Sequence, residues 1–479
     1  MPKGGLLDLV AHGVQDVYLI GNPNYSFFKK VYKRHTNFVS ESIRTTFDGQ
    51  GNFGNKIVID IPRSGDLVNT MLMEVDLPEL EATGSDNMHS IQYIPNVGQA
   101  LIEYAEIKIG GQTIDKQYSE WIYMWSQLTL SSPKLREYNQ MVKSNPQNGP
   151  MTVYVPFYFW FCRDIGNALP LVALQYHKVE LEIALRPLDK LYNFGARNYY
   201  DLTFVEEVQY LGTTQYKYKK SKGLNFLSSI SNKLYVYNNG NQNANITYID
   251  PNNILLDIKL PDSGLTRGYI KPTYTIVGQP SITNIRVYID YIYLDTFERQ
   301  YFAKEEHRYL IEQIQYNEGI GITNSESTKK TIIDFNLPVK ELLWVIQNNE
   351  VLDNNELLNF KNTADEIYEN PVDDINDVTL LYNGNERFEA RSGEYFRLIQ
   401  PFQKHRQSVF DKYIYVYSIA AKPEEHEPSG ASNFSKIDKV EFVSNLRNGR
   451  TYNSVLKIFG INYNILRITK GMGGIAFSN

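Results

Sequence analysis

The chain has 479 residues, 42% of them hydrophobic, which is enough for a large folded core of two or three β domains. Its net charge of −6 gives no strong electrostatic reason to wrap nucleic acid, which normally requires a basic surface. The only cysteine is Cys162, so an intrachain disulfide is excluded, and this fits folding in a reducing compartment.

The amino-terminal region is mixed in character. It reaches Asp8 within a few residues, so we expect no secretory signal there, and no 18-residue apolar window predicts a membrane-spanning helix. A short helix is predicted from Asp16 to Tyr32. The basic stretch Lys29 to His35 is interleaved with aromatic residues and suits acidic lipid headgroups or nucleic acid. A contact between subunits or within a lattice explains it equally well.

Alternation of apolar and polar residues recurs through most of the chain and predicts strands with one buried face. The clearest example runs from Val179 to Leu185, and similar runs are Ala105 to Ile109, Asn284 to Asp290 and Tyr413 to Ile419. Turn signals occur at Gly110-Gly111, Asn148-Gly149, Asn239-Gly240, Asn383-Gly384 and Asn448-Gly449. These patterns predict an all-β fold.

Helical patterning is scarce after the amino terminus, with further helices predicted at Tyr118 to Leu130 and Thr296 to Tyr309. The second of these separates two strand-rich halves, so we place a domain boundary near residue 300. The polar stretch from Tyr192 to Pro280 contains strand-like runs and is interpreted as a large insertion in the first half.

Near the carboxyl end, the apolar positions change phase. Leu456 and Ile458 are even-numbered, whereas Ile461 and Ile465 are odd-numbered, and the change falls across Phe459-Gly460. We predict a β-bulge there, because a bulge would let one long strand serve both faces of a sheet.

Signals for catalysis or cofactor binding are weak. The run Gly49 to Gly54 has dinucleotide-loop spacing, but the predicted strand Lys56 to Ile61 follows where a helix is required, which favours a glycine-rich loop. The acidic run Glu424 to Glu427 has side chains that bind divalent cations, yet its flanking prolines favour a solvated loop. The seven histidines lack metal-site spacing, and no nucleophile elbow or phosphate loop is found. We therefore predict no catalytic, cofactor-binding or metal-binding residues, and no enzyme activity.

Five runs spread over nearly the whole chain are similar to one protein family. They are Gly21 to Phe38, Asp290 to Gln313, Pro338 to Val345, Pro428 to Asp438 and Asn464 to Gly474. On these runs the chain resembles the major capsid proteins of nucleocytoplasmic large DNA viruses, especially the phycodnavirus-like and mimivirus-like viruses of algae and protists. The polar insertion before residue 280 is larger than this resemblance leads us to expect.

The resemblance implies two tandem eight-stranded antiparallel jelly rolls, a double jelly roll, with a few short helices. It implies an N-terminal inner-face segment over residues 1–24, a first jelly roll over 25–300 with a large loop insertion around 192–280, and a second jelly roll over 301–479. The implied function is that of a structural major capsid protein. As a homotrimer it would form pseudo-hexagonal capsomers that tile the icosahedral shell of a large double-stranded DNA virus.

The resemblance also implies partners and a location. The partners are further copies of the chain, neighbouring capsomers, minor capsid proteins and the inner viral membrane through the segment Pro2 to Tyr32, with no direct contact to nucleic acid. The location is the outer capsid of the virion, after assembly in the host cytoplasm. The insertion is expected on the outer surface.

Two other readings stay open, a minor capsid protein of the same fold and a carbohydrate-binding β-sandwich, because jelly rolls also serve as lectins. Aromatic residues stack on sugar rings, but the four tryptophans lie in apolar sequence surroundings that favour a core position. They are Trp121, Trp125, Trp160 and Trp344. A glycoside hydrolase is disfavoured because no pair of catalytic carboxylates stands out.

Overall fold

A computed structural model gives the fold in two units, residues 1–38 and 39–479, each described by itself. The described residues are 10–11, 13–14, 16, 20–83, 91–145, 148–193, 199–220, 233–236, 242–249, 253–257, 259, 266–270, 275–361, 373–407, 410–450 and 452–477.

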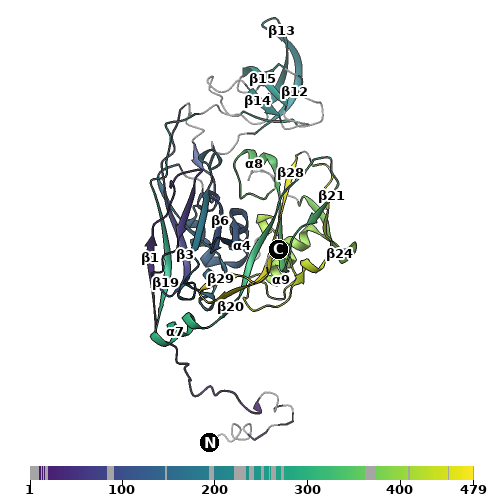
Figure 1. Cartoon of the computed structure of the whole chain (residues 1–479). Coiled ribbons are helices and arrows are strands. Elements are labelled where there is room, and N and C mark those ends of the chain that lie inside the picture. The colour runs from purple at the N-terminus through teal and green to yellow at the C-terminus, as the bar shows by residue number, and fades with distance from the viewer. Residues whose placement is uncertain are drawn as a thin grey trace, which may run out of the picture. The chain divides into compact units, whose positions relative to one another are not determined.

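The first half of the large unit is a sandwich of two sheets (Figure 1). Its strands are β1 (Phe38–Thr45), β2 (Lys56–Asp60), β3 (Leu67–Leu77), β6 (Ile102–Ile109), β7 (Gln112–Tyr118), β8 (Met151–Pro156), β10 (Val179–Leu185) and β19 (Asn284–Leu294). The sheet orders are β1-β19-β3-β8 and β2-β10-β6-β7. Counted along these eight strands, the orders are 1-8-3-6 and 2-7-4-5, which is the arrangement of a jelly roll.

The second half repeats this arrangement. Its strands are β20 (His307–Ile322), β21 (Thr328–Ile333), β22 (Pro338–Asn348), β23 (Ile375–Tyr382), β24 (Asn385–Ser392), β25 (Tyr415–Ser418), β27 (Val440–Leu446) and β28 (Ser454–Thr469). The orders β20-β28-β22-β25 and β21-β27-β23-β24 again correspond to 1-8-3-6 and 2-7-4-5. The predicted fold class, two eight-stranded antiparallel jelly rolls, is therefore confirmed. Two short strands, β26 (Ser432–Asn433) and β29 (Met472–Ile475), pair with β22 and β28.

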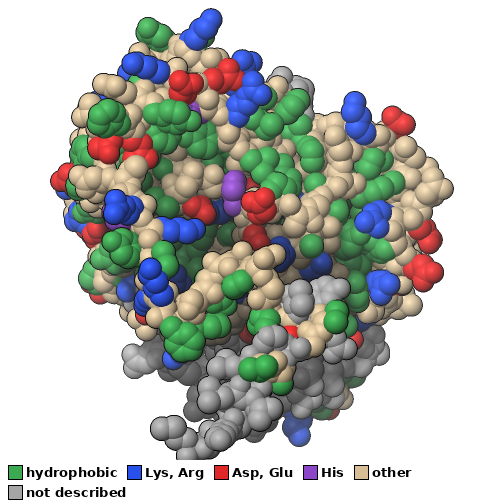
Figure 2. Space-filling model, turned by 90° about the horizontal axis from the view of Figure 1, so that it is seen from below, with side chains coloured by type: hydrophobic (Ala, Val, Ile, Leu, Met, Phe, Trp, Pro, Cys, Tyr) green, Lys and Arg blue, Asp and Glu red, His purple; other side chains and the backbone are tan. Residues whose placement is uncertain are grey.

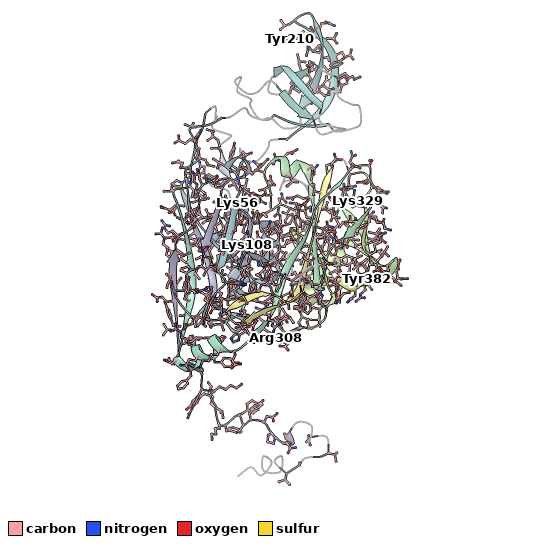
Figure 3. All side chains as sticks on the ribbon, in the orientation of Figure 1. Lys56, Lys108, Tyr210, Arg308, Lys329 and Tyr382 are labelled. Atoms are coloured by element: carbon pink, nitrogen blue, oxygen red, sulfur yellow. The ribbon has the colours of Figure 1, made fainter. Side chains whose placement is uncertain are left out.

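The alternating pattern of β10 separates core from surface as predicted. Leu181 and Ile183 are fully buried in the core of the first jelly roll. Glu182 points to the outer face, where Lys108 of β6 lies 2.7 Å away and Lys56 of β2 lies 3.4 Å away (Figure 3). The hydrogen bond from Lys108 is the main reason why the pKa of Glu182 falls to about 2. Such cross-strand charge pairs keep this sheet face polar.

The polar insertion differs from the predicted loop, because it folds into a closed barrel of its own. The barrel strands are β12 (Tyr199–Tyr210), β13 (Thr213–Lys220), β14 (Lys233–Val236), β15 (Gln242–Ile249), β16 (Asn253–Leu256) and β17 (Thr266–Ile270). They close in the order β12-β13-β16-β15-β14-β17 (Figure 1). The chain enters through β11 (Tyr192–Asn193), which pairs with β5 (Gln92–Tyr93), and returns through β18 (Thr275–Ile276), which pairs with β4 (Ala82–Thr83). Closure pairs the strand edges, so a polar composition does not prevent a regular fold.

The helices are short. The α-helices formed by the described residues of the large unit are α3 (Val97–Leu101), α4 (Ser119–Thr129), α5 (Ser132–Met141), α6 (Trp160–Arg163), α7 (Thr296–Lys304), α8 (Asn349–Asp353) and α9 (Gln400–Lys404). The predicted helix Tyr118 to Leu130 is confirmed by α4. The prediction Thr296 to Tyr309 is right in its first part only, because α7 ends at Lys304 and β20 begins at His307.

The helix predicted from Asp16 to Tyr32 is wrong for residues 21–32, which are not helical. Asn22 has a φ of 49° and precedes Pro23. Proline has no N–H to donate and disfavours the α conformation of the residue before it, so the helical pattern is broken there.

Two of the predicted turns are tight hairpins. Gly110-Gly111 joins β6 to β7 and Asn383-Gly384 joins β23 to β24, and all four residues have positive φ. Asn148-Gly149 and Asn448-Gly449 lie in loops instead, and Asn239-Gly240 lies outside the described residues. The strand predicted from Tyr413 to Ile419 is shorter, because β25 spans only Tyr415 to Ser418.

The bulge predicted at Phe459-Gly460 is wrong. Strand β28 runs unbroken through these residues and pairs in register with β20 on one side and β22 on the other. The register shifts belong to the partner strands, and one of them lies at Lys340 of β22.

The phase change in β28 has another cause, which is burial of both strand faces. Leu456 and Ile458 are in the core of the second jelly roll, whereas Phe459 and Ile461 are in the cluster that contains the core of the first and extends into the second. A strand buried on both faces has apolar residues at consecutive positions. This strand therefore joins the two cores.

Gly460 tests this account of β28, because a Cβ there would lie 2.7 Å from the ring of Phe335. We expect Gly460→Ala to lower the free energy of unfolding by about 1–3 kcal/mol, since overpacking forces neighbouring groups to shift. Urea unfolding measures this. Gly321→Ala on β20 is the control, because a Cβ there meets nothing within 4 Å. Equal stability of the two variants would contradict the tight packing.

Candidate functional site at the seam

Charged side chains are buried where the two jelly rolls meet, a surface that we call the seam. It lies among α4, α6, β7, β20, β22 and β28, and its apolar residues belong to one cluster shared by both halves. Trp121 and Trp125 of α4 are in this cluster together with Phe459 and Ile461 of β28.

Glu312 of β20 is the central charge of the seam and is almost fully buried. Its two oxygens form ion pairs with Arg163 of the first jelly roll and Lys340 of the second. Lys340 is itself completely buried and also donates to the carbonyl oxygen of Pro423 at 2.6 Å. Burial acts to raise the pKa of Glu312, but Lys340 and Arg163 outweigh it and hold that pKa below its usual value. One carboxylate thus binds a cation from each jelly roll.

Aromatic rings cover these cations. The guanidinium of Arg163 lies 4.7 Å from the ring centre of Trp125 and 5.5 Å from that of Trp121. The ammonium of Lys340 lies 5.9 Å from Trp125. Cation–π contacts are strongest where water is excluded, so α4 of the first jelly roll shields charges from both halves.

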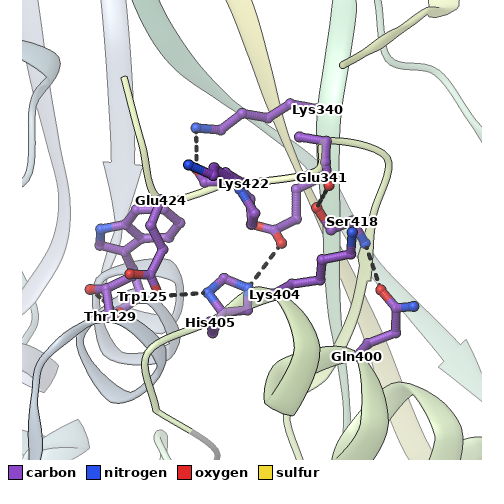
Figure 4. Close-up of polar contacts among 12 residues, drawn as sticks. Trp125, Thr129, Lys340, Glu341, Gln400, Lys404, His405, Ser418, Lys422 and Glu424 are labelled. Atoms are coloured by element: carbon purple, nitrogen blue, oxygen red, sulfur yellow. Dashed lines mark hydrogen bonds and ion pairs between the residues drawn. The ribbon is translucent and has the colours of Figure 1, made fainter. Parts of the chain in front are cut away.

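His405, which follows α9, forms a second charged group at the seam (Figure 4). Its Nε2 lies 2.9 Å from Glu341 and its Nδ1 lies 3.1 Å from Glu424. Burial acts to lower the pKa of His405, but the two carboxylates, Glu341 first, outweigh burial and raise that pKa to about 9. The ring meets Trp125 edge-on. The imidazolium is therefore charged at neutral pH and ties this segment to α4.

Glu120 of α4 gives a third charged contact across the seam. Lys457 of β28 lies 2.9 Å from it, and Arg186 lies 3.4 Å away. Burial acts to raise the pKa of Glu120, yet Lys457 and Arg186 lower that pKa to about 2. The carboxylate is thus ionised and paired at neutral pH.

Strands β7 and β20 also meet at the seam through side-chain hydrogen bonds. The backbone N–H of Ile314 donates to Asp115 of β7 at 2.9 Å, and Gln313 donates to the carbonyl oxygen of Ile114. Burial raises the pKa of Asp115 to about 6. Strand β7 lies at the edge of its sheet, and β20 of the second jelly roll thus supplies hydrogen-bond partners along this edge.

The hairpin of β28 and β29 reaches over the first jelly roll. The N–H of Tyr176 donates to Gly471 at 2.9 Å, and the N–H of Gly473 donates to His177 at 3.2 Å. A Cβ at Gly473 would lie 2.6 Å from Leu174. The glycines near the carboxyl end therefore allow a close backbone contact between the two halves.

The structure shows where the residues named in the sequence analysis lie. All four tryptophans are buried, so the core interpretation is confirmed and they offer no platform for a sugar. Glu424 binds His405 and Glu425 binds Lys422, while the run Gly49 to Gly54 leads into strand β2. Among the described residues, no group of three or more potential ligands is placed to hold a metal ion. No helix in the described chain has both the length and the apolar character to cross a membrane.

Sequence reasoning missed the seam charges, because their partners lie far apart along the chain. One signal was present: Lys340 and Glu341 interrupt the otherwise apolar strand Pro338 to Asn348. Charges inside an apolar strand are buried only if they are paired, so this dipeptide pointed to an internal ion-pair site.

Comparison with known proteins supports the two-part organisation. Residues 26–217 match a family model described as the major capsid protein N-terminus, and residues 298–474 match one described as the large eukaryotic DNA virus major capsid protein. The major capsid protein of Pyramimonas orientalis virus is 34% identical over 99% of this chain and 100% of its own length. Probable capsid protein 4 of Acanthamoeba polyphaga mimivirus is 33% identical over 99% of both chains. The crystal structure of PBCV-1 VP54 superposes with a TM-score of 0.68 at 26% identity, covering 95% of this chain and 100% of that one.

Removing one cation from Glu312 should destabilise the chain. We expect Lys340→Met to lower the free energy of unfolding by about 3–5 kcal/mol, because breaking a buried ion pair leaves a charge poorly compensated. Chemical unfolding measures this. The control is Lys178→Met, which removes an exposed ion pair with Asp60 and should leave stability unchanged. If Lys340→Met left the free energy of unfolding unchanged, this ion pair would not stabilise the seam.

The His405 group predicts a loss of stability at alkaline pH. A folded-state pKa of about 9 exceeds the ordinary value of about 6.5, so the contribution is full below about pH 6.5 and is lost as the pH rises through about 9. His405→Gln should remove this part of the pH dependence of the unfolding free energy. His35→Gln, in the separate N-terminal unit, is the control. If both variants kept the alkaline loss of the unaltered chain, His405 would not be its source.

Proposed function

The chain belongs to the family of large eukaryotic DNA virus major capsid proteins, and from this we propose that it is the subunit of a homotrimeric capsomer. A major capsid protein is a structural component of the virion capsid and not an enzyme. The observation that carries the proposal is the repeated strand order of two jelly rolls locked together within one chain.

Three such chains provide six similar wedges. A ring of three closes through contacts between two different patches of each subunit, and closure prevents open fibres. Jelly rolls pair most of their strand edges internally, so identical units pack closely without edge-to-edge aggregation. A six-wedged ring of this kind tiles a hexagonal lattice, as the faces of an icosahedral shell require.

The wedges correspond to residues 25–300 and 301–479, with residues 1–24 as a segment on the inner face. This division is supported by the position of the strands, because the last strand of the first jelly roll, β19, ends at Leu294 and the first strand of the second, β20, begins at His307. Helix α7 fills the interval between them.

The insertion over residues 192–280 belongs on the outer surface of the shell, where variable structure is best tolerated. Two observations support this placement. The insertion forms a barrel with its own closed strand order, and residues 218–297 lie outside both family matches. A map of the trimer with the barrel on the genome side would refute it.

The inner face contacts minor capsid proteins and, through Pro2 to Tyr32, the inner membrane. The end of the first jelly roll with α7 exposes Phe297 and Tyr301, and Figure 2, viewed from below, shows hydrophobic side chains among charged ones. Exposed aromatic residues of this kind are typical of protein contacts. The net charge of −6 argues against direct contact with the genome.

The shell in question is the outer capsid, and assembly takes place in the host cytoplasm. The single thiol of Cys162 suits that reducing compartment. A minor capsid protein of the same fold is the nearest rival, and the names of the relatives favour the major protein. The share of this chain in the mass of purified virions separates the two, because a major capsid protein makes up most of the shell.

Light scattering of the purified chain tests the trimer. We expect a mass of three times 55.3 kDa that is stable over a range of concentration and salt. Closed trimers with large apolar interfaces do not dissociate on modest dilution. A strict monomer under all these conditions would contradict the capsomer proposal.

A further inference from the structure

The N-terminal arm, defined as residues 20–38, exposes an unusual number of large apolar side chains. Phe28 is 99% exposed and Phe27 is 87% exposed. The other large apolar side chains exposed in the arm are Ile20, Tyr25, Val31, Tyr32 and Phe38. Soluble surfaces rarely carry such a group without a binding partner.

The arm is also strongly basic. It contains Lys29, Lys30, Lys33 and Arg34, all exposed, and no acidic residue occurs between positions 17 and 40. The whole chain has a net charge of −6, so the four positive charges of the arm leave −10 on the remainder. The arm thus has the charge to bind an anionic surface.

The mixture of charge and apolar surface distinguishes between anionic partners. Nucleic acid would pair with the four cations but would leave Ile20, Val31 and other apolar side chains in water. The interface of a bilayer accepts both, because lysine and arginine bind anionic headgroups while aromatic and aliphatic side chains enter the boundary with the acyl chains. The composition of the arm therefore favours a lipid surface.

The backbone of the arm limits how deep it can bind. Residues 21–37 are not helical, and Asn22 has a left-handed φ of 49° before Pro23. A backbone without regular hydrogen bonds needs water for its polar groups, so it cannot enter the hydrocarbon core. The arm suits shallow binding in the headgroup region.

We propose that the N-terminal arm binds the surface of a bilayer that contains anionic phospholipid, with the four cations on headgroups and Phe27, Phe28 and Tyr32 at the acyl boundary. This rests on the proposed function, in which the segment faces the inside of the shell. It gives the chain a direct attachment to lipid in addition to its contacts with other proteins.

Flotation of the full-length protein with vesicles tests the proposal. One set of vesicles mixes phosphatidylcholine with phosphatidylserine, and the other contains phosphatidylcholine alone. We expect binding to the mixed vesicles that weakens with salt, and little binding to the neutral ones. The variant K29Q/K30Q/K33Q should bind the mixed vesicles about a hundredfold more weakly. The variant F27S/F28S should lose at least about tenfold, even at low salt.

The matched control is K56Q/K178Q/K330Q, which removes three exposed lysines outside the arm and should bind as the unaltered chain does. Equal loss in this control would overturn the proposal, because net charge alone would then explain binding. Full binding by both arm variants, or tighter binding to duplex DNA than to mixed vesicles, would also overturn it.

Light scattering on every sample separates this proposal from the capsomer. A trimer that ignores the mixed vesicles refutes the lipid site and leaves the capsomer intact. A monomer that binds them through the arm refutes the capsomer and leaves the lipid site intact. Loss of the trimer in the arm variants would show that the arm is a contact between subunits and would overturn the lipid site.

Discussion

The rest of the structure depends on one buried carboxylate, Glu312, held between Arg163 and Lys340. Removing ions from water costs several kcal/mol each, and only well-placed partners offset this cost. Because the two cations come from different jelly rolls, the cost is offset only in one relative arrangement of the halves. An apolar contact alone would tolerate sliding, whereas this ion group does not. The two jelly rolls are therefore held in one relative arrangement.

Backbone contacts reinforce the same arrangement. Strand β28 contributes side chains to both cores, and its hairpin with β29 is bonded to Tyr176 and His177 of the first jelly roll. Gly473 permits that approach because a side chain there would collide with Leu174. Ion pairs, a shared strand and a close backbone contact thus act on the same seam, and a shell subunit needs this rigidity to present two fixed surfaces to its neighbours.

The sequence predicted the all-β class and many strands, because one-sided burial produces a period of two, as in Val179 to Leu185. It failed where burial is two-sided, and the apolar run of β28 was misread as a bulge for that reason. The barrel was expected as a loop because its composition is polar, although strand pairing needs no apolar core on every face. Pairs such as Glu120 with Lys457 were beyond reach, since nothing in one sequence links positions so far apart.

Electron microscopy of the proposed trimer, viewed along its threefold axis, tests the central claim most directly. If the seam locks the two jelly rolls of each chain, the averaged image has a hexagonal outline with six equally sharp lobes. Three sharp lobes alternating with three blurred or variably placed ones would contradict the account, because the second jelly roll would then move independently of the first.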